Sequence, residues 1–272
     1  MSTFAPITVI LPTHDHVSTL EFSIRSILNQ SFQDLELVVV GDGIGEDSRS
    51  IIKNLLAQDK RIRLIDKPKS IRHGESIRDL VIRESNSKFI AYHGDDDLML
   101  PNHLETMLEE ISDSNFIHPL PIQIGTDGIL RYLPADLSNK ECINWHLSEK
   151  IQNAVSLTGV VHTRESYLQL PIGWSEAPKE IPSDLYMWKQ YFLLPNFRGK
   201  TSTISTTIKL DASLRKEMSA LERATEINEW WIRICEPDFQ KKWERLTTEV
   251  VQKSAFQQFI TKQISDTEYL EN

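Results

Sequence analysis

Apolar residues in the first hundred positions follow two alternating spacings. Continuous apolar runs rich in β-branched residues occupy 7–11 and 35–40, as expected of parallel strands covered on both faces. Apolar residues at helical spacing separate the two runs: Val17, Leu20, Ile24, Ile27 and Leu28. The alternation continues with a helix at 50–58, a strand at 61–66, a helix at 75–85 and a strand at 88–93. This β-α-β-α-β-α-β order predicts a parallel sheet with right-handed crossovers.

Polar, loop-forming residues follow three of these strands, at 13–15, 41–43 and 94–97. Because ligands bind at the carboxyl ends of strands in open α/β sheets, the sequence predicts a functional site at this edge. The polar stretch after the second strand also contains Asp47 and Ser48. Either residue is expected to cap the helix that follows.

The second half of the chain has a mixed pattern. Short strands are predicted at 128–133 and 157–163, and a helix near 183–194. From 211 onward the pattern is helical, with an apolar face made of Leu214, Met218 and Leu221 that continues through Leu246, Val250, Phe256 and Ile260. Packing against the first domain is the favoured role of these helices, and a dimer contact is an alternative.

Length, composition and charge narrow the class of protein. The 272 residues suit one large α/β domain or one domain with an added helical part, and 40% hydrophobic and 25% charged residues are ordinary for a globular chain. The net charge of −9 argues against a nucleic-acid partner, whose binding surfaces are basic. Two cysteines are too few for a disulfide framework, and neither a signal peptide nor a run of about 18 apolar residues occurs. We therefore expect a cytoplasmic protein without a transmembrane segment.

Three consecutive aspartates, Asp95, Asp96 and Asp97, follow the strand predicted at 88–93. Adjacent carboxylates repel one another, and nothing basic within the run "FIAYHGDDDLMLP" offsets them. A divalent cation would supply the missing charge and would in turn bind an anionic ligand. The alternative is a solvated acidic loop before a helix at Pro101, with Asp97 favoured by the helix dipole. The strand ahead of the triplet favours the metal site.

Two segments resemble the inverting family 2 glycosyltransferases of the GT-A fold: "ITVILPTHDHVSTLEFSIRSILNQSFQDLELVVVGDG" and "SIRDLVIRESNSKFIAYHGDDDLMLP". In that family a first strand ends in Pro-Thr, a helix with a Gln-Ser/Thr end follows, and an Arg-Asn helix leads into a "DxD" strand end. The resemblance covers residues 6–112 and extends weakly to 195. The chain departs from the family pattern at Gly41 and Gly94, where acids are usual, and at Asp79, where Asn is common.

The resemblance implies a GT-A domain at 1–210, with a nucleotide-binding half at 1–112 and an acceptor half at 113–210, and a C-terminal helical extension at 211–272. It further implies metal-dependent, inverting transfer of a sugar from a nucleotide diphosphate donor to an acceptor hydroxyl, with Mn²⁺ or Mg²⁺ as cofactor. The expected acceptor is a saccharide or glycolipid in polysaccharide or glycolipid assembly. The C-terminal helices are also candidates for acceptor binding or homo-oligomer formation, and peripheral membrane contact of the protein is a further expectation.

By the same resemblance Asp96 is the metal ligand, Asp97 a supporting acid at the metal, and Asp95 a ribose or outer-sphere contact. Asp42 would accept a hydrogen bond from the nucleotide base, which makes a UDP-sugar the first expectation. As an alternative, Asp42 is a turn-former in "GDG".

Other residues of the predicted nucleotide site are Pro12, Thr13, Asp15 and Arg78. Pro12 and Thr13 would border the base and ribose, or would simply end the strand. Arg78 would steady the nucleotide or the loop around the metal, unless it is an ordinary solvated or ion-paired arginine.

The predicted acceptor side contains Asp184 in "SDLYMW", which matches the family's downstream acid and would deprotonate the acceptor hydroxyl. Its alternative role is in a capping Ser-Asp pair at the helix start. Trp174 would stack on a sugar or cover the core. His162 is expected to be a structural histidine.

Two rival enzyme classes lack their signatures. A sugar nucleotidyltransferase needs a glycine-rich, basic loop after the first strand, and "LPTHDHVSTL" has neither feature. A P-loop phosphotransferase needs Gly-Lys-Ser/Thr. A degenerate GT-A domain that binds a nucleotide sugar or a partner protein remains as the alternative, because of the substitutions at Gly41 and Gly94.

Overall fold

The computed structural model describes residues 5–270, and all structural statements refer to them. The first half contains β1 (Ile7–Thr13), α1 (Val17–Leu28), β2 (Leu35–Asp42), α2 (Glu46–Gln58), β3 (Ile62–Lys67), α3 (Glu75–Glu84), β4 (Phe89–Tyr92), β5 (Leu98–Met99), α4 (His103–Ile111), β6 (Phe116–His118), β7 (Ile122–Ile124) and β8 (Leu130–Tyr132). The second half contains α5 (Lys140–Leu147), β9 (Val161–Thr163), α6 (Arg164–Tyr167), α7 (Ser183–Phe192), β10 (Gly199–Thr201), β11 (Thr207–Ile208), a 3-10 helix (Ala212–Leu214), α8 (Ala220–Ile234) and α9 (Phe239–Leu270).

Seven strands form the central sheet in the order β10-β6-β9-β4-β1-β2-β3. β1 lies between β2 and β4 and pairs with both in parallel, and β2 pairs in parallel with β3. The parallel sheet predicted for the first half is therefore confirmed. β9 is inserted antiparallel between β4 and β6, which makes the whole sheet mixed.

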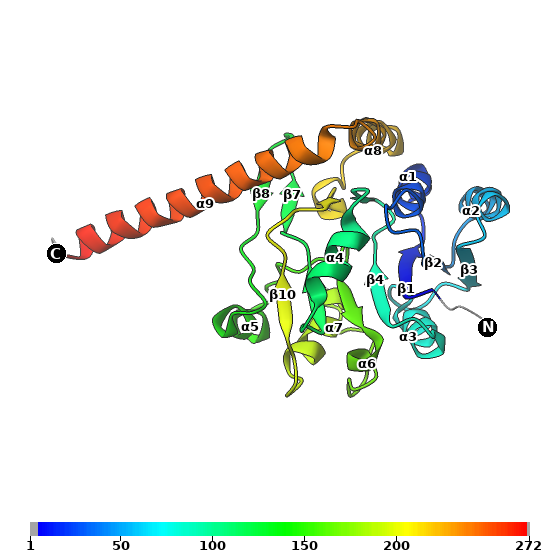
Figure 1. Cartoon of the computed structure of the whole chain (residues 1–272), viewed down its shortest axis with the longest axis horizontal. Helices are drawn as coiled ribbons and strands as arrows, with labels where there is room; N and C mark the ends of the chain where they lie inside the picture. Colours follow the sequence, from blue (N-terminus) through cyan, green and yellow to red (C-terminus); the bar gives the residue numbers. More distant parts are fainter. Residues whose placement is uncertain (1–4, 271–272) are drawn as a thin grey trace.

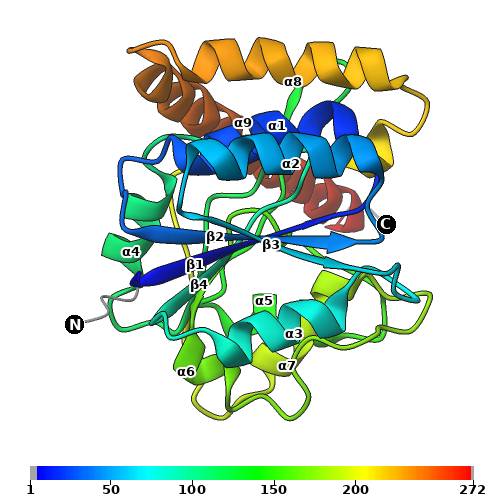
Figure 2. The same ribbon diagram turned by 90° about the vertical axis from the view of Figure 1, so that its right-hand side faces the viewer.

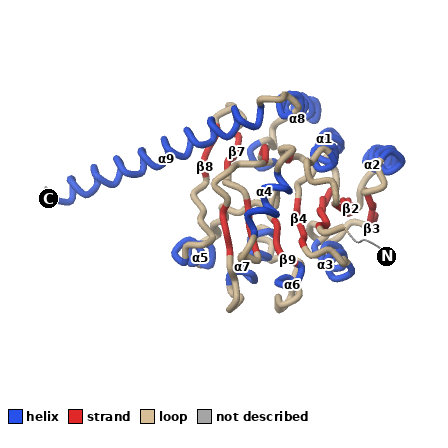
Figure 3. The backbone as a smooth tube through the Cα atoms, in the orientation of Figure 1, coloured by secondary structure: helices blue, strands red, loops and turns tan. Residues whose placement is uncertain are grey.

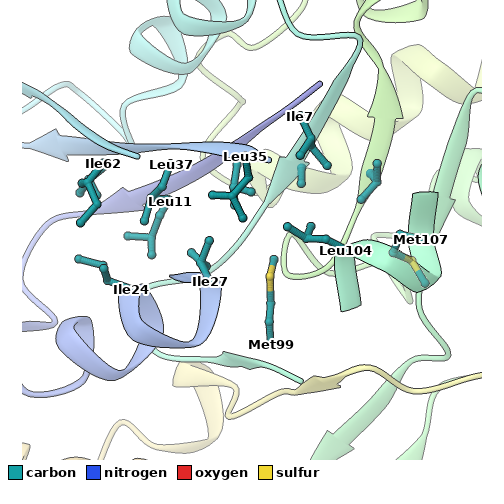
Figure 4. Packing of buried hydrophobic residues seen from close by; sticks show 14 of the residues in the cluster. Ile7, Leu11, Ile24, Ile27, Leu35, Leu37, Ile62, Met99, Leu104 and Met107 are labelled. Atoms are coloured by element: carbon teal, nitrogen blue, oxygen red, sulfur yellow. The ribbon is translucent and has the colours of Figure 1, made fainter. Parts of the chain in front are cut away.

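Helices cover both faces of the sheet, with α1, α2 and α8 on one side and α3, α6 and α7 on the other (Figure 2). Alternate residues of β1 enter different cores, because successive strand side chains point to opposite faces. Val9 and Leu11 join the core under α1, whose packing is drawn in Figure 4, and Ile10 joins the core under α3.

A short antiparallel ribbon places part of the second half beside the aspartate triplet. β5 pairs with β11, with Leu98 opposite Ile208 and Met99 opposite Thr207. This register brings the residues that follow β11 next to those that precede β5. β7 and β8 form a separate two-stranded sheet, so the strand predicted at 128–133 is confirmed in its central three residues.

The helix cap predicted after β2 is wrong. α2 begins at Glu46, with Gly45 as its N-cap residue and without a side-chain capping bond. Glu46 and Asp47 lie in the first turn, where the helix dipole favours negative charge, so the helix starts before the expected caps.

The C-terminal helices pack differently from the predicted apolar face. Leu214 lies in the 3-10 helix and is 46% exposed, whereas α8 begins only after Ser219, which forms a capping box with Glu222. The buried residues of α8 are Ile227 and Ile234, and the helix packs against α1. The expected packing of the C-terminal helices against the first domain is thus correct for α8, but the residues that are buried differ from those predicted.

α9 packs through its first turns and then extends away from the body (Figures 1 and 3). Phe239 and Trp243 are buried, and the helix contacts β8. Of the predicted apolar face, Val250 packs partly buried against the core, whereas Leu246, Phe256 and Ile260 are exposed. No helix of the described residues combines the length and apolarity needed to cross a bilayer. Cys142 and Cys235 are free thiols.

Candidate functional site

The three consecutive aspartates are buried rather than solvated. Asp95, Asp96 and Asp97 are 8%, 6% and 0% exposed, so a solvated acidic loop is the wrong interpretation. α1 holds their backbone: the hydroxyl of Thr19 donates to the carbonyl of Asp95, and that of Ser23 to the carbonyl of Asp97, both at 2.8 Å. The carboxylates are therefore fixed at the end of β4 by the helix that follows β1.

Each aspartate has a basic partner from a different part of the chain. Nδ1 of His16, after β1, lies 2.8 Å from Oδ1 of Asp95. The guanidinium of Arg223, on α8, lies 2.8 Å from Oδ2 of Asp96, and Nζ of Lys209, after β11, lies 2.9 Å from Oδ2 of Asp97. Three segments distant in sequence thus supply the positive charge that the triplet lacks locally.

Asp97 is engaged through both carboxylate oxygens. Oδ1 accepts from the backbone N–H of Leu210 at 2.7 Å, and Oδ2 accepts from Lys209 and from the Thr158 hydroxyl. Burial opposes ionisation, but Lys209 and the Thr158 hydrogen bond hold the pKa of Asp97 below its ordinary value. Asp97 is therefore an ionised internal anchor.

Asp96 has the opposite electrostatic environment. Burial, followed by the negative charge of Asp97, raises its pKa to about 7, although Lys209 opposes the shift. Additional positive charge at this point would stabilise the ionised carboxylate.

The residues around Asp96 fit a divalent cation. His16, Asp95 and Asp96 offer ligand atoms that lie within 4.8 Å of one another. Carboxylate oxygens suit Mg²⁺ and Mn²⁺, and imidazole suits transition metals. The hydroxyl of Thr13 is buried without a hydrogen-bond partner, and Thr13 borders the same cavity as His16.

A cavity of about 370 Å³ opens beside the triplet and gathers most of the predicted nucleotide-binding residues. Its lining comprises Pro12, Thr13, His14, Asp15, His16, Asp42, Lys69, Arg72, His73 and Asp95. Five predicted residues are thus brought together from the ends of β1, β2 and β4. Arg78 is absent from the lining.

Asp42 organises the loop after β3. Its carboxylate accepts from Nζ of Lys69 and from the backbone N–H of Ser70, both at 2.6 Å, and from the Ser70 hydroxyl at 2.9 Å. Although burial opposes it, these donors lower the pKa of Asp42. Asp42 therefore holds another loop in place and is more than a turn-former in "GDG".

Arg78 is buried behind that same loop. Its guanidinium stacks 3.9 Å from the centroid of Trp174 and donates to the carbonyl of His73 at 3.2 Å. Nε1 of Trp174 donates to the hydroxyl of Tyr92 at 2.9 Å, and Trp174 is 2% exposed. Arg78 thus supports a loop that lines the cavity, and Trp174 belongs to the core. His162 is also structural: it is fully buried and bonded to Tyr92.

The predicted catalytic acid borders a second cavity of about 400 Å³. Thr158 and Lys209, which both bond to Asp97, border it together with Asp184 and Asp211. The two cavities are thus linked through the acidic triplet.

Asp184 lies in the first turn of α7. The N-cap residue is Pro182, so the expected Ser-Asp pair does not occupy the N-cap position, but Oδ1 of Asp184 still accepts from the free backbone N–H of Leu185 at 2.7 Å. Burial raises the pKa of Asp184, while the N–H of Leu185 and the charges of Lys209 and Arg78 oppose the shift. A raised pKa makes this carboxylate a better proton acceptor than an ordinary aspartate.

Four basic residues of the site were missed in the sequence: His16, Lys69, Lys209 and Arg223. Their carboxylate partners are between 27 and 127 positions away, so no local spacing connects them. Only the positions of His16 and Lys69 pointed to the site, because His16 follows the first strand and Lys69 follows the third, and loops after strands border the predicted site.

Comparison with protein families and curated proteins gives one consistent result. The family model described as Glycosyl transferase family 2 matches residues 8–162. An uncharacterized glycosyltransferase of Rickettsia bellii is 36% identical over 113 residues, which are 42% of this chain and 16% of that protein. The GalNAc(5)-diNAcBac-PP-undecaprenol beta-1,3-glucosyltransferase of Campylobacter jejuni is 29% identical over 39% of this chain and 35% of that protein. The match to each relative spans less than half of that relative's length.

Solved structures share the fold at low sequence identity. TarS residues 1–349 of S. aureus gives a TM-score of 0.57 at 14% identity, covering 84% of this chain and 71% of that one. The same fragment in complex with UDP-GlcNAc also gives 0.57 at 14% identity, over 75% and 58% of the two chains. The expected fold class is confirmed: a GT-A, mainly parallel sheet flanked by helices, with C-terminal helices.

The ion pair between His16 and Asp95 makes stability depend on pH. The hydrogen bond to Asp95 raises the pKa of folded His16 to about 9 from an ordinary 6.5. The pair therefore stabilises the metal-free fold fully below the ordinary pKa, and this contribution is lost as the pH rises through the folded value. Substitution His16→Gln should lower the free energy of unfolding most at about pH 6 and least at about pH 10.

Urea unfolding in EDTA measures this difference. His14→Gln in the same loop is the matched control, because His14 is exposed and should show no comparable pH dependence. An equal loss for His16→Gln at every pH would contradict a charged imidazole.

Proposed function

Because the chain belongs to glycosyl transferase family 2, we propose that it transfers a sugar from a nucleotide diphosphate donor to an acceptor hydroxyl. The observation that carries the proposal is the pair of cavities linked by the acidic triplet. Asp95 borders one cavity, and Lys209 and Thr158, both bonded to Asp97, border the other. A donor and an acceptor need such adjoining sites, with the leaving-group charge handled between them.

A UDP-sugar is the proposed donor. Two of the TarS structures are complexes with UDP-GlcNAc or UDP. The Escherichia coli relative WfgD, 27% identical over 40% of this chain and 42% of its own length, is named for UDP-Glc. In the donor cavity, Asp42 would accept from the base, and Pro12, Thr13 and Asp15 would border the nucleoside. Lys69 and Arg72 add positive charge for phosphates, and Arg78 steadies their loop through His73.

The donor set around Asp96 supports the proposed metal dependence. When bound, Mn²⁺ or Mg²⁺ would neutralise the diphosphate and so ease departure of the nucleotide. Asp96 is the central proposed ligand, and Asp97 keeps Lys209 beside the site.

Asp184 is the proposed general base of an inverting displacement. It lies in the second cavity, whereas Asp95 borders the first, so it could deprotonate an acceptor oxygen that attacks from the face opposite the leaving group. Asp211 borders the same cavity, but hydrogen bonds from Ser213 and the charge of Lys209 lower its pKa despite burial, which makes it a weaker base.

The two glycines at expected acidic positions have packing reasons, which supports an enzyme over a degenerate domain. A Cβ on Gly94 would lie 3.0 Å from both Oδ2 of Asp97 and Oγ1 of Thr158. A Cβ on Gly41 would lie 2.9 Å from Cδ1 of Ile44. A side chain at position 94 would press on residues that shape the site, and one at position 41 would press on the core residue Ile44.

The acceptor is proposed to be a saccharide or glycolipid, handled at the cytoplasmic side of a membrane. Two relatives are named for undecaprenol-linked acceptors, which supports this class. Peripheral membrane contact and homo-oligomer formation through α9 are compatible with the proposal.

Substitution Asp96→Asn should abolish the Mn²⁺ dependence of UDP binding. The amide keeps the size of the side chain but removes the ligand charge, so calorimetric affinity for UDP with Mn²⁺ should fall at least about tenfold, to the level in EDTA. Asp66→Asn is the control, since Asp66 pairs with Arg49 outside the cavity. Unchanged Mn²⁺-dependent affinity in Asp96→Asn would refute the metal assignment.

Substitution Asp42→Asn should remove a preference for UDP over GDP and ADP. A hydrogen bond to a charged acceptor is worth about 1.5–3 kcal/mol, enough to select a base. Competition among the three diphosphates separates two effects. If the substitution only loosens the loop of Lys69, the affinity for all three diphosphates should fall alike. If it removes base recognition, only the affinity for UDP should fall.

Substitution Asp184→Asn should lower turnover by roughly 10²–10⁴-fold while leaving donor affinity unchanged, because the base contacts the acceptor. Hydrolysis of the donor sugar measures turnover where no acceptor is known. Asp211→Asn, from the same cavity, is the matched control and should retain far more activity. If Asp211→Asn lowered turnover more than Asp184→Asn, Asp211 would be the general base instead.

A further inference from the structure

We infer that His16 is a nitrogen ligand of the divalent cation, together with Asp95 and Asp96, and that it makes the site select Mn²⁺ over Mg²⁺. This inference rests on the metal dependence proposed above. It replaces the pair Asp96 and Asp97, expected from the sequence, with a set drawn from the ends of β1 and β4.

The distances suit one small cation. The ligand atoms of His16, Asp95 and Asp96 lie within 4.8 Å of one another. Metal bonds of about 2.1 Å with octahedral geometry require ligand atoms roughly 3–4 Å apart, so modest side-chain rotations bring the three into range. The imidazole of His16 is 29% exposed and borders the donor cavity, which leaves it room to turn.

Asp97 is poorly suited to be a direct ligand. Its oxygens already accept from the Leu210 N–H, the Thr158 hydroxyl and the Lys209 ammonium. A cation bound to Asp97 would lie against that ammonium, and the repulsion would oppose binding.

His16 differs from the structural histidines of the chain. His103 and His162 are fully buried, and each bonds a hydroxyl: His103 that of Thr206 and His162 that of Tyr92. Among the described residues, the only hydrogen-bond partner of the His16 ring is the carboxylate of Asp95, and the ring is partly open to the cavity. The buried hydroxyl of Thr13, which borders the same cavity and has no hydrogen-bond partner, is a second indication that a ligand binds here.

A nitrogen ligand changes metal preference. Mg²⁺ favours oxygen ligands and retains water, whereas imidazole suits transition metals, which bind N/O sites more tightly in general. Arg223 also affects metal binding, because its guanidinium neutralises Asp96. Its guanidinium also donates to Oδ2 of Asp96 at 2.8 Å, so it competes with any cation at this carboxylate and should weaken Mn²⁺ and Mg²⁺ binding to the same extent.

Pulsed electron paramagnetic resonance of Mn²⁺ with UDP on the full chain tests direct ligation. The wild type should show nitrogen coupling to Mn²⁺ that changes when the protein carries ¹⁵N-histidine. His16→Gln should lose this coupling, and His14→Gln, which removes a ring that borders the same cavity but lies outside the proposed ligand set, should keep it.

Calorimetric titration of Mn²⁺ and Mg²⁺ in the presence of UDP tests selectivity. His16→Gln should lose roughly tenfold or more in Mn²⁺ affinity, with a much smaller change for Mg²⁺. Arg223→Gln should strengthen the binding of both metals while leaving their ratio unchanged.

Two results would overturn the inference in different ways. Mn²⁺ binding without nitrogen coupling, with both metals weakened equally in His16→Gln, would mean that His16 only orients Asp95. The proposed metal dependence would survive that result. Absence of any Mn²⁺ binding by the wild type would remove both the inference and the metal dependence.

Discussion

Burial of three adjacent carboxylates at the end of β4 is the constraint on which the rest of the site depends. Three buried negative charges are too costly to leave unpaired, so the fold must bring positive charge to them. It does so from three directions, with His16 after β1, Lys209 after β11 and Arg223 on α8. Ion pairs therefore connect the C-terminal part of the chain to the aspartates of the first half.

The same constraint organises the two cavities. Asp97 holds Lys209 and Thr158 at the edge of the second cavity, while Asp95 and His16 border the first. Asp42 plays a comparable part at β2, where it fixes the loop of Lys69 and Ser70. Several acidic residues thus serve two purposes, since they set the shape of a cavity and the charge inside it.

Chemically identical side chains acquire different properties from their surroundings. Burial raises the pKa of Asp184 and Asp96, whereas nearby donors lower the pKa of Asp97, Asp42 and Asp211 despite burial. This separation makes Asp184 and Asp96 easier to protonate than an ordinary aspartate and keeps Asp97, Asp42 and Asp211 ionised. Residue type alone does not predict which of these aspartates has a raised pKa and which has a lowered one.

The sequence by itself determined the elements and the edge at which the site forms. Strand and helix periodicity in the first hundred residues is local, and the carboxyl ends of parallel strands must share one edge, so Thr13, Asp42 and Asp95 could be grouped in advance. The tertiary structure alone decided which charges meet. Asp96 and Arg223 are 127 positions apart, and the β5–β11 pairing that brings Lys209 to Asp97 involves only two residues in each strand. Such short strands carry almost no periodic signal. The failed prediction for the C-terminal helices has a related cause: helical spacing fixes which residues share a face, but only packing against α1 decides which face is buried and where the helix begins.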